Sequence, residues 1–72
     1  MSNLEIGNQI KLRRKTLRIK QAELANLADV SINTLYKIER GQANPALDTL
    51  KKIADILGME VTMQVKKLKD TD

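Results

Sequence analysis

The feature that most constrains the fold of this sequence is a pair of short helical segments separated by the three residues "DVS". The first segment, residues 21–28, has its apolar residues at helical spacing. The second, residues 31–41, places Leu35 and Ile38 on one edge, polar side chains on another and a glycine stop at Gly41. One edge of this second segment must therefore face a core, while the other faces water or a polar partner.

A further helix is predicted before this pair. Ile6, Ile10 and Leu17 recur at helical spacing in a stretch without proline, which predicts a first helix over residues 4–16. Arg14 falls on the same face as Ile10. This basic residue is therefore expected to point inward.

A fourth helix is predicted after the pair. Asn44 followed by Pro45 fits an N-cap and a first-turn proline, because the residue before proline is pushed out of the helical region. Gly58 ends the helix. Ser31 is expected to cap the preceding helix through its hydroxyl. The apolar stripe expected on the fourth helix consists of Leu47, Leu50, Ala54 and Leu57.

The spacing of apolar residues changes after Gly58 from a helical period to alternation with polar residues. Val61, Met63 and Val65 alternate with polar residues, which predicts a β-strand over residues 59–68, although Val61, Val65 and Leu68 would also fit a helix. A lone strand in a helical chain has no partner, so we expect it to pair with the same strand of a second copy. Residues 69–72 are expected to be disordered.

Length and composition restrict the possibilities further. Seventy-two residues make one small domain of marginal stability, because such chains bury only about 60% of the surface that they expose when unfolded. The absence of cysteine and histidine excludes disulfides and a zinc site with the usual nitrogen and sulfur ligands. Self-association is the remaining source of extra stability.

Several functional classes are not expected. The apolar runs are too short to span a bilayer, and the start "MSNLEIGNQ" lacks the blocks of a signal peptide. We therefore expect a cytoplasmic protein without a membrane partner. The sequence has no Gly-rich phosphate loop and no acidic pair with a reason to lie in a pocket, so we expect no enzyme activity, cofactor or small-molecule ligand.

Positive charge is concentrated in the first third of the chain. The formal net charge is +4, from 13 Lys and Arg against 9 Asp and Glu. Glu5 is the single acidic residue among residues 1–20, whereas residues 46–72 hold five residues of each sign. Clustered cations suit a polyanion such as nucleic acid. From charge alone, a solvated helix face that aids solubility explains them equally well.

The stretch "RRKTLRIKQAELANLADVSINTLYKIERGQANPALDTLKKIADILGM", residues 13–59, resembles the lambda-repressor and Cro type of helix-turn-helix domain, often called the Xre family. The resemblance is carried by QAELA, then VS, then I-E-x-G, then NPxLDTLxKIA. It implies an all-α bundle of four short helices, with residues 1–58 as the DNA-binding domain and a C-terminal strand that pairs between subunits. In such domains the second helix of the motif enters the major groove of DNA.

The resemblance assigns three positions to base edges. Asn33 could pair with adenine through two hydrogen bonds, Lys37 could donate to guanine, and Ile32 could pack on a thymine methyl group. Tyr36 would lie against the DNA backbone or a base. Without the surrounding motif, Asn33 and Lys37 would be better explained as solvent-facing helix residues.

The remaining contacts implied by the resemblance go to phosphates, which set register rather than sequence. Gln21 would offer its backbone N–H and its side-chain amide to a phosphate, and Ser31 would touch one as well as capping its helix. The whole predicted contact set is Gln21, Ser31, Ile32, Asn33, Tyr36, Lys37, Arg40, Gln42 and Asn44.

The inward-facing Arg14 has a separate role in the resemblance. In the family the matching arginine pairs with the glutamate that is Glu39 here, so we expect a structural ion pair between the first and third helices. The outward cations are candidate phosphate contacts only. They are Lys11, Arg13, Lys15 and Arg18.

Three positions depart from the family pattern. Lys20 stands where a capping Ser, Thr or Asn is usual, at a cost of about 1 kcal/mol. Asp29 replaces a usual glycine, but Asp tolerates positive φ, so the turn should survive. Ala46 stands where a capping Ser is common, which is why the cap is assigned to Asn44.

Together these patterns predict a sequence-specific double-stranded DNA-binding repressor that acts as a homodimer on a palindromic operator. A four-helix domain followed by one strand also resembles antitoxins of the HipB type, which hold a toxin of the HipA type. The alternative is therefore an antitoxin that neutralises a partner toxin and represses its own operon. A neighbouring toxin gene would favour this alternative.

Overall fold

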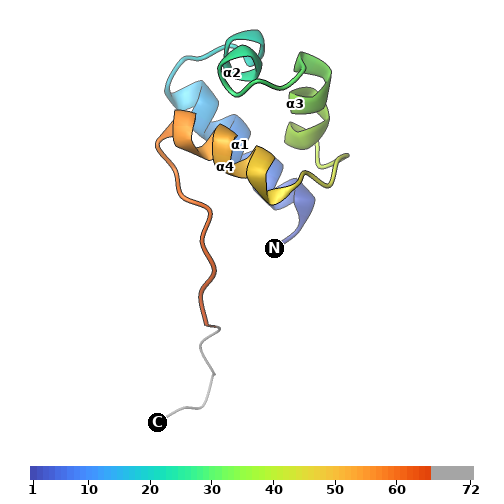
Figure 1. The fold of residues 1–72 in the computed structure, drawn as a ribbon, viewed down its shortest axis with the longest axis vertical. Coiled ribbons are helices and arrows are strands. Elements are labelled where there is room, and N and C mark those ends of the chain that lie inside the picture. The colour runs from blue at the N-terminus through green and yellow to red at the C-terminus, as the bar shows by residue number, and fades with distance from the viewer. Residues whose placement is uncertain (66–72) are drawn as a thin grey trace.

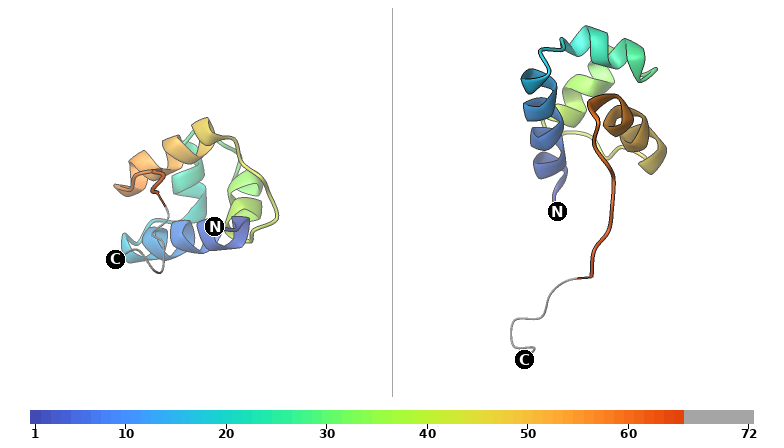
Figure 2. Two further views of the ribbon diagram at one scale, coloured as in Figure 1. Left: turned by 90° about the horizontal axis from the view of Figure 1, so that it is seen from below. Right: turned by 90° about the vertical axis from the view of Figure 1, so that its left-hand side faces the viewer.

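A computed structural model describes residues 1–65, which form four helices and no strand. In chain order these are α1 (Asn3–Thr16), α2 (Gln21–Leu27), α3 (Ile32–Glu39) and α4 (Leu47–Leu57). They pack into one bundle, and the segment after α4 runs away from it (Figure 1). This segment starts between α1 and α4 (Figure 2). The all-helical bundle is confirmed, and each predicted helix is present to within two residues at either end.

The predicted C-terminal strand is not seen. Residues 59–65 form neither strand nor helix, and residues 66–68 lie outside the described part of the chain. A strand is held by hydrogen bonds to a neighbouring strand. Within residues 59–65, the backbone hydrogen bond that the structure shows runs from the N–H of Met59 to the carbonyl of Ala54. A single chain supplies no neighbouring strand, so the alternating pattern alone does not produce one.

All four helices bury apolar side chains in a single core. Ile53 of α4 is completely buried, as are Leu24 of α2 and Leu35 of α3. The stripe predicted on α4 omitted Ile53 and began at Leu47, which is 55% exposed. The core-facing stripe starts one turn later, because an i, i+3, i+4, i+7 pattern is satisfied by Leu50, Ile53, Ala54 and Leu57.

Several helix ends follow the expected chemistry. Ser31 caps α3, where its hydroxyl oxygen accepts a hydrogen bond from the N–H of Thr34 at 3.0 Å. Gly41 and Gly58 follow α3 and α4 with φ of 72° and 69°, in the left-handed region that glycine enters readily. Asp29 takes φ of 56° in the turn between α2 and α3, as its side chain allows.

One predicted N-cap is wrong. Asn44 does not cap α4, because the helix begins after Ala46, which is itself extended and occupies the N-cap position. Ala46 has no side-chain acceptor, so this N-cap makes no side-chain hydrogen bond. Asn44 lies outside the helix, as expected for a residue before proline, but Pro45 does not start the helix.

At α1 the sequence prediction missed a capping box. The Ser2 hydroxyl accepts from the N–H of Glu5 at 3.1 Å, and the Glu5 carboxylate accepts from the N–H of Ser2 at 2.8 Å. The hydrogen bond from the Ser2 backbone N–H, with a smaller contribution from the Ser2 side chain, lowers the pKa of the exposed Glu5 carboxyl. The contribution of this cap to stability is therefore present above the ordinary carboxyl pKa and is lost as the pH falls through the lowered one.

Helices α1 and α3 approach each other closely at Gly7. This glycine is buried in the middle of the first half of α1. A Cβ atom there would overlap the backbone carbonyl oxygen of Ile38 and lie 2.8 Å from that of Glu39. The close contact of α1 with the end of α3 therefore requires a residue without a side chain.

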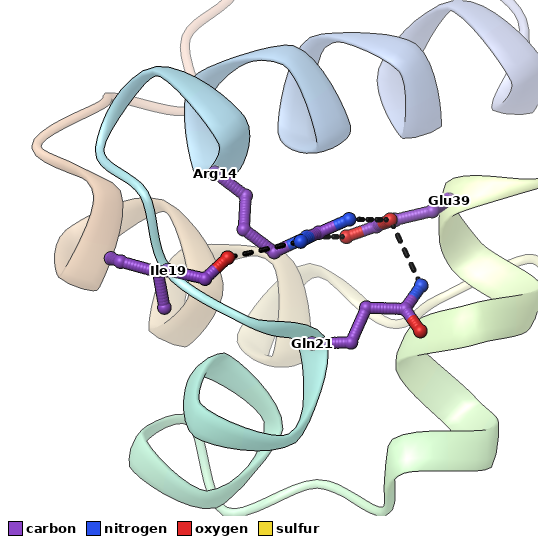
Figure 3. A network of polar contacts seen from close by, with 4 residues as sticks. All are labelled: Arg14, Ile19, Gln21 and Glu39. Atoms are coloured by element: carbon purple, nitrogen blue, oxygen red, sulfur yellow. Dashed lines mark hydrogen bonds and ion pairs between the residues drawn. The ribbon is translucent and has the colours of Figure 1, made fainter.

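A buried ion pair joins the same two helices. The Nε of Arg14 donates to Oε2 of Glu39 at 2.7 Å, and its Nη2 donates to Oε1 at 3.0 Å. Arg14 also donates to the carbonyl of Ile19, and the side-chain amide of Gln21 donates to Oε1 of Glu39, both at 3.0 Å (Figure 3). This polar network of Arg14, Ile19, Gln21 and Glu39 ties α1, the start of α2 and the end of α3 together.

Replacing Gly7 with alanine should destabilise the protein. At an exposed position inside a helix the same change stabilises by about 0.5–1 kcal/mol, because glycine loses more backbone entropy. At Gly7 the overlap with the Ile38 carbonyl reverses the sign, and we expect Gly7→Ala to lower the free energy of unfolding by about 1–3 kcal/mol in urea. The control is Asn8→Ala at the exposed neighbour, with an expected change within about 0.5 kcal/mol. Equal stability of the two variants would contradict the close packing.

Removing the carboxylate of Glu39 should lower the melting temperature strongly. Glu39→Ala leaves the buried charge of Arg14 without a partner, which costs about 3–5 kcal/mol. For a domain of this size, that loss lowers the melting temperature by more than about 12 °C. The exposed Glu23→Ala is the matched control for thermal unfolding followed by circular dichroism. A melting temperature unchanged in Glu39→Ala would refute the structural role of the ion pair.

Candidate nucleic-acid interface

The side of α3 that points away from the core carries four residues of the predicted contact set. The opposite side is buried and includes Leu35, whose side chain is fully enclosed. Residues one helical turn apart lie next to each other, so the side chains of the outer side form one continuous surface. We call this surface the reading face, and it consists of the exposed Ile32, Asn33, Tyr36 and Lys37. Its contact with DNA stays a prediction.

Two hydroxyl groups stand at the start of α3. The Ser31 hydroxyl donates to Oγ1 of Thr34 at 2.8 Å, and both residues are exposed. The pair carries two hydroxyl protons, of which one is used between them, so the other can be donated to a phosphate. Thr34 is absent from the predicted contact set. Its spacing of three residues from the N-cap Ser31 was the signal for this pairing.

The end of α3 holds an arginine above the aromatic ring of the reading face. The guanidinium carbon of Arg40 lies 5.3 Å from the centroid of the Tyr36 ring, within the range of a cation–π contact. Gln42 and Asn44 are exposed in the segment between α3 and α4. The N–H of Gln42 donates to the carbonyl of Lys37 at 2.9 Å, which fixes the backbone as it leaves the helix.

Gln21 differs from the rest of the predicted contact set because it is half-buried. Its side-chain amide donates to Oε1 of Glu39 at 3.0 Å as part of the polar network (Figure 3). One amide proton is therefore engaged inside the protein, and the second is left for another acceptor. The residue links the start of α2 to the end of α3, a role that the sequence did not indicate.

The basic residues of α1 are divided between the interior and the surface. Arg14 is buried in the polar network. Arg13, which was expected to face outward, turns toward α4 and donates from Nε to the carbonyl of Leu57 at 2.8 Å. A cation at the C-terminal end of a helix interacts favourably with the helix dipole, so Arg13 supports α4. Lys11 and Lys15 are exposed, as is Arg18, which follows the end of α1.

Three further features of residues 1–65 concern metals, small ligands and membranes. Within residues 1–65, no three His, Cys, Asp or Glu side chains gather as metal ligands would. A hollow between α1, α4 and residues 59–62 is lined mainly by apolar side chains and lies on different helices from the reading face. None of the helices in the described part of the chain is long and apolar enough to cross a bilayer.

The chain is similar in sequence to known helix-turn-helix proteins. The family model described as "Helix-turn-helix" matches residues 10–63. The immunity repressor protein of Bacillus phage phi105 is 39% identical over 59 residues, which cover 82% of this chain and 41% of the repressor. An uncharacterized HTH-type transcriptional regulator of Haemophilus influenzae is 32% identical over 71 residues, which cover 96% of this chain and 72% of the regulator.

A solved structure shows the same arrangement of helices. The restriction-modification controller protein C.AhdI from Aeromonas hydrophila has a TM-score of 0.77 and 28% sequence identity, over 81% of this chain and 88% of that protein. The chain spans less than half of the length of the phage repressor. The family match covers 54 of the 72 residues and includes α2, α3 and α4 entirely. The chain therefore belongs to the lambda-repressor-like, or Xre, family of helix-turn-helix proteins.

Proposed function

We propose that this protein is a sequence-specific double-stranded DNA-binding repressor of transcription whose α3 lies in the major groove. The observation that carries the proposal is the exposed reading face on a helix whose other side is fixed in the core by Leu35, Ile38 and Glu39. The major groove, about 12 Å wide, admits an α-helix held in this way. The names of the relatives, an immunity repressor and a transcriptional regulator, support the role. The role also agrees with the cytoplasmic location expected from the sequence.

The exposed side chains divide into two groups by chemistry. Asn33 would read adenine through its amide, Lys37 would donate to guanine, and Ile32 would contact a thymine methyl group. Cationic and polar groups around them would bind phosphates and fix the register of the protein on DNA. The phosphate-binding group comprises Gln21, Ser31, Arg40, Gln42 and Asn44, with Tyr36 held beneath Arg40.

A homodimer on a palindromic operator is part of the proposal. Two copies related by a two-fold axis would present their α3 helices about 34 Å apart, one helical turn of DNA. The association would use Val61, Met63 and Val65 after α4. These side chains are 41%, 96% and 99% exposed, respectively, and so are open to a second copy.

The antitoxin alternative is not carried further. It depended on a C-terminal strand, and residues 59–65 form none within one chain. The three proteins compared above are named a repressor, a transcriptional regulator and a controller protein. We also propose no catalytic role for the chain.

Asn33→Ala and Lys37→Ala should each weaken binding to the best DNA site. Losing one good base contact costs about 1–3 kcal/mol, so the dissociation constant should rise by about 5- to 150-fold. The measurement is fluorescence anisotropy with a duplex selected from a random pool, at one fixed salt concentration. Circular dichroism should show wild-type stability, because both side chains are exposed.

The matched controls for these variants are Asn8→Ala on α1 and Lys51→Ala on α4. Each removes the same kind of exposed side chain from a helix outside the reading face. Neither should change the affinity for the selected duplex by more than about twofold. If the variants of Asn33 and Lys37 bind as well as these controls, the reading face is wrongly assigned.

Arg40→Gln should change the salt dependence of binding rather than the sequence preference. A phosphate contact releases about 0.9 counterion, so the slope of log K against log salt concentration should become shallower by about 0.9. Affinity for the selected duplex and for a scrambled duplex should fall by similar factors, because phosphates carry no base information. Asn33→Ala should leave the slope unchanged. An unaltered slope in Arg40→Gln would exclude the phosphate contact.

A further inference from the structure

An apolar groove lies between α1 and α4, where the chain leaves the bundle. It has a volume of about 200 Å³, and its apolar walls are formed by Ile6, Ile10, Leu50, Ala54, Met59 and Val61. Ile10 and Ala54 are buried at its base, while most of the other walls are only partly covered. We call this hollow the α1–α4 groove.

The segment after the groove, residues 59–65, is extended and has no partner within the chain. Met63 and Val65 are 96% and 99% exposed, and two residues apart on an extended chain they point to the same side. In the part of the chain that the structure describes, residues 60–65 make no backbone–backbone hydrogen bond. Both the apolar side chains and the backbone of this tail are therefore available to a partner.

The tail does not fill the α1–α4 groove of its own chain beyond its first residues. It starts between α1 and α4 and then runs past the end of the bundle (Figures 1 and 2). The chain thus carries an open apolar groove and, next to it, an open apolar segment that points away from that groove. Exchange of tails between two copies covers both surfaces at once, and two-fold symmetry repeats the same contact.

The spacing of the exposed apolar side chains matches the spacing of the groove walls. Met63 and Val65, two residues apart, lie about 7 Å apart on an extended chain. The groove is lined by Ile6 and Ile10 of α1 and by Leu50 and Ala54 of α4, and each pair lies four residues or about 6 Å apart along its helix. Two side chains of an exchanged tail can therefore contact both turns of each wall.

We propose that Met63 and Val65 of one copy dock in the α1–α4 groove of a second copy, so that two chains form a tail-exchanged homodimer. This inference rests on the homodimer in the proposed function and assigns the surface that receives the partner. The walls of the groove come from α1, α4 and the tail, whereas the reading face lies on α3. Tail exchange therefore leaves the reading face uncovered.

Disulfide trapping tests this contact directly, because the chain has no cysteine of its own. Gln9 lines the groove, and Val65 is one of the two docking side chains. Gln9→Cys and Val65→Cys are prepared as separate proteins with different mass tags, mixed and oxidised gently. A mixed disulfide can then form only between two chains. We expect it to form at least about tenfold faster than with Lys11→Cys, an exposed α1 position on the other side of the helix.

A second experiment measures dimerisation of a variant without the two docking side chains. The double variant Met63→Ser/Val65→Ser should raise the dimer dissociation constant by about 100-fold or more in sedimentation equilibrium, since apolar burial is lost in both copies. Thr62→Ser/Gln64→Ser, which changes only polar tail residues, is the matched control and should dimerise as the wild type does. Circular dichroism of dilute protein should show equal helix content for all variants, because Met63 and Val65 are exposed in the single chain.

The outcomes separate this inference from the proposed function. A wild-type monomer, equal trapping at Lys11→Cys, or full dimerisation by the Met63/Val65 variant would each overturn tail docking. Cross-linking found only within one chain of the Gln9→Cys/Val65→Cys double variant would show that the tail folds back, and would also overturn it. Asn33→Ala should lose DNA affinity while remaining a dimer. Failure of DNA recognition by the reading face is therefore distinguishable from failure of tail docking in the α1–α4 groove.

Discussion

The whole fold depends on one buried ion pair between the first and third helices. Arg14 and Glu39 are only 9% and 3% exposed, and such burial removes water from both charges. The cost is offset only when the geometry is good and the remaining polar atoms are hydrogen-bonded. Here the carbonyl of Ile19 and the amide of Gln21 complete the set, and no buried side-chain polar atom among the described residues is left without a partner. Because these bonds are directional, they fix the orientation of α3, and the exposed reading face follows from that orientation.

Much of this architecture can be predicted from the sequence because local chemistry determines it. Ser31, Gly41 and Asp29 each have one conformation that suits them, and the helix boundaries follow from these residues. The sequence-based predictions are wrong where a contact with a residue far along the chain determines the position of a side chain. Gly7 looks like a weak point in a helix, yet the carbonyl of Ile38 requires it, and no pattern within α1 reveals a neighbour 31 residues away. Arg13 was predicted to face outward for the same reason, since its partner is the carbonyl at the end of α4.

In the candidate interface, too, some features follow from local sequence and others depend on contacts between distant residues. The exposed positions of α3 follow from helical spacing, because Leu35 and Ile38 define the buried side. The pairing of Gln21 with Glu39 joins residues 18 apart, and the sequence did not indicate it. The contact of Arg40 with Tyr36 joins residues four apart at the end of one helix, so its spacing was a signal that the sequence prediction missed. The C-terminal strand was predicted from alternation alone, but a strand also needs a neighbour, and one chain does not supply it.

The size of the reading face shows what the proposed second copy would add. At about 1–3 kcal/mol each, the three proposed base contacts would give one chain about 3–9 kcal/mol, whereas roughly 4–10 kcal/mol separates specific from non-specific DNA binding. Two copies held together would double the number of base contacts, and the exposed tail offers a way to hold them. The central claim is that α3 reads DNA, and the most direct test is selection of bound duplexes from a random pool. The claim predicts an enriched inverted repeat whose half-site centres lie about 10 base pairs apart. Recovery of a pool with no enriched sequence would contradict it.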